Sequence, residues 1–402
     1  MGGHKHYKGY QAYEYLVPGK DYQVFELAQE INRVPGYVVP TTEDQEARVR
    51  QLLETSVVIS LHDHPTVQPQ DLGFIREYIR EGREHTAYRA LSTSFLDAVF
   101  DNLMDGTAMI TSKMGWKWSD TIYDIGMRLC DIAHQDFVVV GKNASDIRSA
   151  HKNGQLALFL ALEAATSIEN EVDRIDILYG LGIRMMGIAY CESNQLGSGQ
   201  EEDRDGGLTH FGHQAVGRMN RIGMAIDISH SDERTSLDVI EASRKPVFLT
   251  HGGARGLCLE DMPNYRRCAP DSVIEACGQA GGVIGIEAAP HQTITVNHTE
   301  HTIDAMMEHF EYVKDLVGID HITFGPDTLY GDHVGLHHAF ADQLSITPSN
   351  YPEVDYVKGI ENPSEAFPNI VRWLVIHNYS NEEIHKVIGE NTLRVLNDVW
   401  VG

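Results

Sequence analysis

The sequence has few cysteines, and their spacing suggests neither a disulfide framework nor a thiolate metal site. Its five cysteines are scattered along 402 residues and never form a Cys-x-x-Cys pair. An odd, dispersed set is typical of reduced thiols, because disulfide-rich secreted proteins and cysteine-ligated zinc sites show paired spacings. We therefore expect a cytoplasmic protein.

Long apolar segments are also missing. No apolar run reaches the roughly 18 to 20 residues that a helix needs to cross a bilayer. The first residues, MGGHKHYKGY, lack the apolar core of a secretory signal. The last residues, RVLNDVWVG, lack the hydrophobic tail that a lipid anchor replaces. We expect no membrane partner.

Positive charge is scarce as well. The chain has 32 basic and 58 acidic residues, which gives a formal net charge of −26. A field of this sign repels a phosphate backbone, so we expect no nucleic-acid partner. No glycine-rich dinucleotide fingerprint follows the first apolar run, so the sequence indicates no nucleotide cofactor.

What the sequence does contain is a series of short apolar runs separated by helical patterns. Apolar residues make up 42% of the chain, enough for a large buried core. Continuous runs of this length are typical of strands buried on both faces. We predict strands at residues 57–61, 107–111, 156–162, 184–189, 224–229, 247–250, 282–287 and 321–325. Helical stretches between them include HFGHQAVGRMNRIG, SDERTSLDVIEASRK and DSVIEACGQAG.

This alternation predicts a (β/α)8 barrel of the TIM type. We assign residues 1–50 to an N-terminal arm and residues 51–402 to the barrel, with longer helical insertions at 65–105 and 112–153. The tyrosines of the arm are expected to pack on the barrel or on a neighbouring subunit, which suggests a homo-oligomer. An open, doubly wound sheet is the alternative, but it would gather its ligands at one switch point.

Polar residues with metal-binding side chains follow most of the predicted strands. A barrel builds its active site from residues at the carboxyl ends of successive strands. The residues in question are His62, His64, Glu163, Tyr190, His230, His251 and Asp327. Three or more imidazoles with two carboxylates at one rim indicate a metal-dependent hydrolase.

The spacing of these residues indicates individual roles. His62 and His64 alternate along a strand, so both side chains can reach one metal ion. His230 and His251 follow consecutive strands and suit a second metal ion. Glu163 closes a buried strand, where an acid needs a cation. That cation is either Arg184 or a pair of metal ions, and the nearby histidines favour the metals.

Asp327 also has two readings. Aspartate often caps a turn or helix, but here it can move a proton between water and a leaving group. The histidine-containing segment 328–345 follows it and forms a lid, a substrate wall or a solvated loop.

Several longer motifs occur in a recognisable order: LGIRMMGIAY, DGGLTHFGHQAVGRMNRIGMAIDISHS, KPVFLTHGGARGLC, RRCAPDSV and GIDHITFGPD. From about residue 55 to the end, the chain resembles the membrane (renal-type) dipeptidases, peptidase family M19, of the metal-dependent amidohydrolase superfamily. The resemblance implies two zinc ions per chain, or another divalent metal, holding a bridging hydroxide.

The resemblance also implies a role for each residue. His62 would bind the first zinc ion, Glu163 would bridge both, and His230 and His251 would bind the second. Asp327 would be the proton shuttle. Arg267, in RR-x-x-PD, would grip a substrate carboxylate, which the arginine fork suits. Otherwise, Arg266 and Arg267 form a solvated loop pair.

The chain departs from the family pattern at two positions. His64 stands where the family usually has aspartate, which removes one negative charge from the first metal site. Tyr190 stands where the family has a histidine that faces the substrate, and a phenol can still donate a hydrogen bond to an oxyanion.

We therefore predict hydrolysis of the amide bond in small dipeptides or N-acyl amino acids. Another reaction at the same metal site is the alternative, such as that of a lactonase, a deaminase or a non-oxidative decarboxylase. A third hypothesis is a catalytically silent barrel that serves as a binding module.

Overall fold

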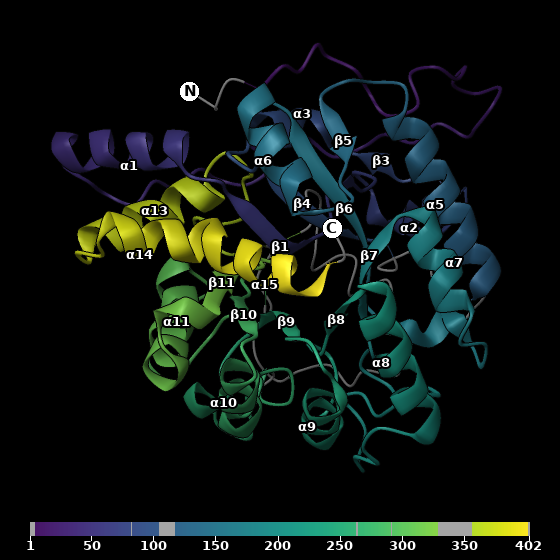
Figure 1. Cartoon of the computed structure of the whole chain (residues 1–402). Coiled ribbons are helices and arrows are strands. Elements are labelled where there is room, and N and C mark those ends of the chain that lie inside the picture. Colours follow the sequence, from purple (N-terminus) through teal and green to yellow (C-terminus); the bar gives the residue numbers. More distant parts are fainter. Residues whose placement is uncertain are drawn as a thin grey trace.

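The computed structural model describes residues 5–81, 83–103, 117–262, 264–290, 292–328 and 356–400. Parallel strands form a central barrel with helices around it (Figure 1). In spatial order the strands are β1 (Ile59–Asp63), β4 (Ala98–Asn102), β6 (Leu156–Leu162), β7 (Ile183–Gly187), β8 (Ala225–Asp227), β9 (Phe248–Gly252), β10 (Val283–Ile286) and β11 (Ile322–Phe324). A short strand, β5 (Val138–Val140), pairs with β6 outside this order.

Backbone hydrogen bonds bring the first and last strands together. The N–H of Asp327, just after β11, donates to the carbonyl of His62 in β1 at 3.1 Å. The N–H of His64 donates to the carbonyl of Thr328 at 3.3 Å. The sheet is therefore nearly closed at the carboxyl ends of its strands. The predicted barrel is confirmed, and the open sheet is excluded.

The second strand of the barrel differs from the prediction. The predicted strand at 107–111 lies outside the described residues, whereas β4 occupies Ala98–Asn102. Its place within 65–105 shows that the helical assignment was wrong there. All five residues of β4 are buried, but Asp101 and Asn102 interrupt the apolar run that reveals the other strands. The stretch 112–153, also predicted to be helical, contains the strand β5.

Helices cover the outside of the barrel (Figure 1), and local sequence signals cap their ends. Thr42 caps the first helix through a capping box with Gln45. α8 ends at Gly223, whose φ of 80° is a left-handed conformation that glycine adopts without strain. The helices are α1 (Glu43–Thr55), α2 (Ile75–Arg80), α3 (Tyr88–Thr93), α5 (Trp118–Ile132), α6 (Ala144–Asn153), α7 (Arg174–Leu181), α8 (His210–Ile222), α9 (Glu233–Ala242), α10 (Asp271–Gln279), α11 (Ile303–Val317), α13 (Ala366–Ile376), α14 (Asn381–His385) and α15 (Asn391–Val399).

Apolar side chains fill the barrel interior, and α15 lies across one end of it (Figure 1). Phe159 of β6 stacks on Phe100 of β4, with ring centroids 5.1 Å apart. Trp400, just after α15, stacks on Phe159 at 4.9 Å. This packing leaves the carboxyl ends of the strands as the end at which polar side chains gather.

The segment before α1 packs on its own barrel. The hydroxyl of Tyr10 donates to Asp131 of α5 at 2.8 Å, and the backbone N–H of Tyr13 donates to the same carboxylate at 2.7 Å. Lys5 lies 3.4 Å from Asp97, near the start of β4. The division into an arm (1–50) and a barrel (51–402) stays a prediction.

The described helices are too short or too polar for a bilayer span. The longest, α5 and α11, have 15 residues each, and none in the described ranges meets the length and hydropathy of a membrane-crossing helix.

Candidate metal centre

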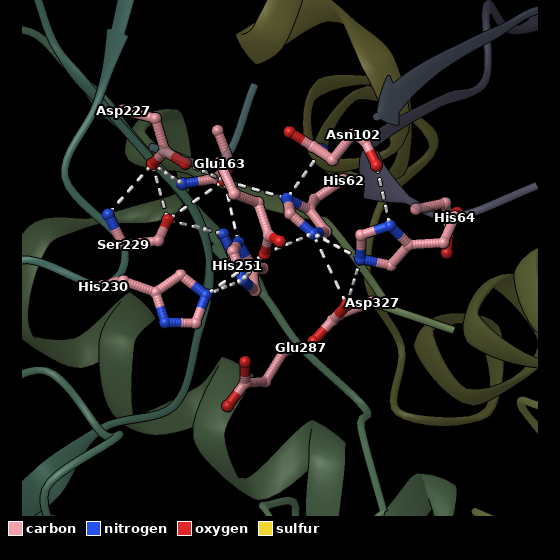
Figure 2. Close-up of polar contacts among 12 residues, drawn as sticks. His62, His64, Asn102, Glu163, Asp227, Ser229, His230, His251, Glu287 and Asp327 are labelled. Carbon is pink, nitrogen blue, oxygen red and sulfur yellow. Dashed lines mark hydrogen bonds and ion pairs between the residues drawn. The ribbon is translucent and has the colours of Figure 1, made fainter. Parts of the chain in front are cut away.

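Four histidines and two acids converge at the carboxyl ends of the barrel strands (Figure 2). Each of the six is 6% exposed or less. They are His62 in β1, His64 just after it, Glu163 after β6, His230 after β8, His251 in β9 and Asp327 after β11. The structure thus brings together side chains from five strands, as the sequence predicted.

Glu163 stands between two pairs of imidazoles. Its Oε1 lies 3.4 Å from His62 Nε2 on one side, and His62 Nε2 lies 3.3 Å from His64 Nε2. On the other side, Oε1 lies 3.2 Å from His230 Nε2 and 3.6 Å from His251 Nε2. The Nε2 atoms of His230 and His251 are 3.0 Å apart. This arrangement provides two donor sets, His62–His64–Glu163 and Glu163–His230–His251, that share one carboxylate.

The donor set fits a pair of divalent metal ions. The second oxygen of Glu163 is buried and has no hydrogen-bond partner among the described residues. Arg184 does not neutralise this carboxylate, because its guanidinium donates to the carbonyls of Lys142 and Tyr179 at 2.9 Å and 2.8 Å. The alternative of a salt bridge with Arg184 was therefore wrong. A buried carboxylate surrounded by imidazole nitrogens is a site for cations.

The protonation states of His230 and His251 agree with such a site. Burial lowers the pKa of His230 and of His251 below the ordinary histidine value. Both rings are thus held neutral near pH 7, the form that binds metal ions. Burial also opposes protonation of His62, but contacts with Asp327 and Glu163 outweigh it and raise its pKa to about 9. The carboxylates of Asp327 and Glu163 therefore favour a positive charge at the His62 side chain.

Asn102 orients both imidazoles of the first donor set. Its side-chain Nδ2 lies 2.9 Å from His62 Nδ1, and its backbone carbonyl lies 3.0 Å from His64 Nδ1. Contacts to the non-coordinating nitrogen fix the ring orientation of metal-binding histidines. Sequence reasoning missed Asn102 because it missed β4, which ends at this residue.

A second support holds His251. The hydroxyl of Thr250 lies 2.9 Å from His251 Nδ1 and donates to Asp227 Oδ2 at 2.7 Å. Asp227 also accepts from the Ser229 hydroxyl at 2.5 Å. Asp227 thus helps to orient His251 through Thr250, which the sequence did not single out.

Asp327 lies beside the first donor set. Its Oδ1 is 3.4 Å from His62 Nε2 and 3.2 Å from His64 Nε2. The residue has a φ of 55°, a left-handed conformation that aspartate and asparagine adopt more readily than most residues. The tight turn after β11 therefore points this carboxylate toward the histidines (Figure 2).

Tyr190 borders the second donor set. Its ring lies with its centroid 4.3 Å from that of His230, at an angle of 37°, and it is partly exposed. The neighbouring thiol, Cys191 Sγ, lies 3.9 Å from His230 Nδ1.

Arg267 reaches the same mouth of the barrel. It is 5% exposed, and its Nη2 lies 2.6 Å from Oε2 of Glu287, just after β10. Arg266 is exposed and points toward Asp203 at 3.7 Å. The reading of a solvated loop pair was thus wrong for Arg267. Glu287 was missed as a site residue, although it closes a buried strand as Glu163 does.

The role of the segment 328–345 as a lid, a substrate wall or a solvated loop stays a prediction. Of the segment 328–345, only Thr328 lies within the described residues.

Comparisons with known proteins agree with this geometry. The family model for membrane dipeptidase (peptidase family M19) matches residues 46–339. The dipeptidase aclJ of Aspergillus oryzae is 27% identical over 268 residues, which cover 66% of this chain and 57% of that protein. The dipeptidase tcpJ of Claviceps purpurea is 27% identical over 69% of this chain and 58% of its own length. The chain thus spans less than two thirds of these relatives.

A solved structure extends the comparison over most of the chain. The crystal structure of an amidohydrolase from Pseudomonas aeruginosa has a TM-score of 0.70 and 27% identity, covering 88% of this chain and 99% of that one. The family match over residues 46–339 agrees with the barrel and its donor set. The chain therefore belongs to the membrane dipeptidase family, peptidase family M19.

Proposed function

We propose that this chain is a zinc-dependent hydrolase that cleaves the amide bond of small dipeptides or N-acyl amino acids. The observation that carries the proposal is the shared position of Glu163, whose Oε1 lies within 3.6 Å of imidazole nitrogens from both donor sets. Nitrogen donors with a bridging carboxylate suit zinc. The two relatives named as dipeptidases support the choice of an amide substrate.

The residues of the chain divide the chemistry among them. When bound, two divalent cations would lower the pKa of water from ~15.7 to about 7 and polarise the scissile carbonyl. Asp327 accepts the proton of the attacking water at its carboxylate and passes it to the leaving amine. The hydroxyl of Tyr190 donates a hydrogen bond to the oxyanion of the tetrahedral intermediate. Arg267 is already paired with Glu287, so its predicted grip on a substrate carboxylate has no part in this scheme.

Elemental analysis combined with a substrate panel tests the proposal. The purified protein should contain about two equivalents of zinc, as in two-metal hydrolases, and should release an amine from dipeptides or N-acyl amino acids. Turnover should stop after dialysis against a chelator and return when zinc is added. Bound zinc without turnover of any amide would refute the proposed reaction.

A second reaction at the same centre is favoured by two residues. His64 and Tyr190 both depart from the family pattern, and both lie at the donor sets. The panel therefore also includes lactones and aromatic acids, because one metal centre can serve several reactions. A protein that binds no metal would instead support the silent binding module.

Location and assembly stay proposals. We propose a cytoplasmic homo-oligomer that acts on a small molecule. The scattered cysteines support the location, and the exposed apolar side chains of Val17 and Val24 in the N-terminal segment support the assembly. Fractionation of cells and light scattering of the purified protein test these two points.

A further inference from the structure

A buried ion pair lies beside the metal centre and has no role in the chemistry above. Glu287 and Arg267 are 1% and 5% exposed, and Oε2 of Glu287 lies 2.6 Å from Nη2 of Arg267. Ligand atoms of Glu287, His251 and Asp327 lie within 4.8 Å of one another. Glu287 therefore lies beside His251 and Asp327, where a substrate must lie to reach the metal ions (Figure 2), and Arg267 is paired with it.

The terminal nitrogens of Arg267 are already engaged. Nη2 donates to the carbonyl of His251 at 3.3 Å in addition to its contact with Glu287, and Nη1 donates to the carbonyl of Ser229 at 3.3 Å. An arginine grips a carboxylate best through two parallel N–H donors. A substrate carboxylate would have to displace Glu287 before Arg267 could hold it in this way.

Glu287 also presents a free acceptor. Its Oε1 is buried and has no hydrogen-bond partner within the described part of the chain. The same is true of Nε of Arg267. An incoming carboxylate offers only acceptors and a second negative charge, so Glu287 repels it. A primary amide offers both a donor and an acceptor, which is what an open carboxylate oxygen and an open N–H require.

We propose that Glu287 determines the substrate class of this centre by neutralising Arg267, so that the substrate group beside the pair is an uncharged amide and not a free carboxylate. The inference rests on the proposed amide hydrolysis and changes one feature of the substrate, replacing the free carboxylate of the dipeptide or N-acyl amino acid by an uncharged carboxamide. Dipeptide carboxamides, and amides of N-acyl amino acids, are then better substrates than the corresponding free acids.

The wild-type protein provides the first test. Zinc-loaded protein is assayed with alanylalanine and with alanylalaninamide, and cleavage of the bond between the two residues is followed by separation of the products. We expect kcat/KM to be at least about ten-fold higher for the carboxamide, because an unpaired buried polar group penalises the wrong substrate. A preference for the free acid would overturn the inference.

The variant Glu287→Gln provides the second test. It keeps the shape of the side chain and removes its charge, which frees Arg267 to bind an anion. We expect the ratio of kcat/KM between carboxamide and free acid to fall by about ten-fold or more. An unchanged ratio in a folded, zinc-loaded Glu287→Gln protein would also overturn the inference. A purely structural role would lower both rates together and leave their ratio unchanged.

The chain offers a matched control. Glu361 is 4% exposed and lies 3.6 Å from Arg33 of the N-terminal segment, so Glu361→Gln also removes a buried carboxylate paired with an arginine. For Glu361→Gln, the ratio of kcat/KM between carboxamide and free acid should equal that of the wild type. Should Glu287→Gln fail to fold, the ratio of kcat/KM between carboxamide and free acid in the wild type tests the inference by itself. If the wild type cleaves neither substrate, the proposed function itself fails, which differs from cleavage with the opposite preference.

Discussion

Asp327 is joined to His62 twice. Its backbone N–H donates to the carbonyl of His62 at 3.1 Å, and its carboxylate Oδ1 lies 3.4 Å from His62 Nε2. The contact that brings the last strand to the first therefore also fixes the proposed proton shuttle beside a proposed metal ligand. In this protein, closure of the sheet and assembly of the site depend on the same residue.

Replacement of Asp327 by asparagine should separate its charge from its backbone role. Asparagine tolerates the φ of 55°, so Asp327→Asn should fold and bind metal as the wild type does. We expect kcat to fall by roughly 10²- to 10⁴-fold, the usual contribution of a general acid–base group. Steady-state kinetics and the thermal midpoint measure the two effects. Asp327→Ala, which strains the turn, should in addition lose about 1 kcal/mol of stability. Full activity in Asp327→Asn would contradict the proton-transfer role.

Replacement of Glu163 by glutamine should affect the metal content before the chemistry. The carboxylate is the shared donor of both sets, so its loss weakens both. We expect Glu163→Gln to retain less than about one equivalent of zinc after dialysis, against about two in the wild type. The wild type should also melt at a higher temperature with zinc than after chelation, because a ligand at 1,000 times its Kd stabilises the folded state by ~4 kcal/mol. Equal zinc content in variant and wild type would argue against a bridging role.

The variant His64→Asp tests the departure at the first donor set. An aspartate at this position adds a negative charge close to the metal ion. We expect the first zinc ion to bind at least about ten-fold more tightly, equivalent to ~1.4 kcal/mol. Competition with a chromophoric chelator measures the affinity, and His64→Asn serves as the uncharged control. If Asp and Asn at this position give the same affinity, the charge of this residue does not control the site.

The stability of the barrel should depend on pH through Glu46, far from the metal centre. Arg372 of α13 donates to Glu46 of α1 at 2.9 Å and 2.8 Å, and these hydrogen bonds lower the pKa of Glu46. A lowered pKa stabilises the folded state above the unfolded value of ~4.3, and this stability is lost as the pH falls further.

Urea unfolding of Glu46→Gln measures that contribution. We expect a loss of about 0.5–1 kcal/mol at pH 7, since the pair is partly exposed, and a smaller difference from the wild type at pH 3.5. Glu43→Gln, at an exposed acid of the same turn, should show little change at either pH. A loss for Glu46→Gln that is independent of pH would exclude the ion pair as its cause.

The sequence predicted the barrel and the convergence of its ligands because both depend on local pattern. The run LALFLAL reads plainly as a buried strand, and the acid that ends it, Glu163, reads as a ligand. The strand Ala98–Asn102 could not be recognised in this way, since two of its five residues are polar. Their burial depends on partners far away in the chain, such as Arg128, which lies 3.4 Å from Asp101.

The same limit applies to the supporting residues. Asn102 contacts His62, which is distant in the sequence. Thr250 contacts its neighbour His251, but tertiary contacts hold that imidazole in place. No local pattern therefore identifies either residue as a support of the site. Glu287 had the same signal as Glu163, an acid at the end of a buried strand. What could not be read from the sequence was its pairing with Arg267, because the two residues lie on separate segments that only the tertiary fold brings together.

Anomalous X-ray diffraction at the zinc edge, on crystals of the zinc-loaded protein, tests the central claim most directly. Two anomalous peaks are predicted, one between His62 and His64 and one between His230 and His251, both within bonding distance of Glu163. The absence of peaks at these residues, or their appearance only elsewhere on the chain, would contradict the account.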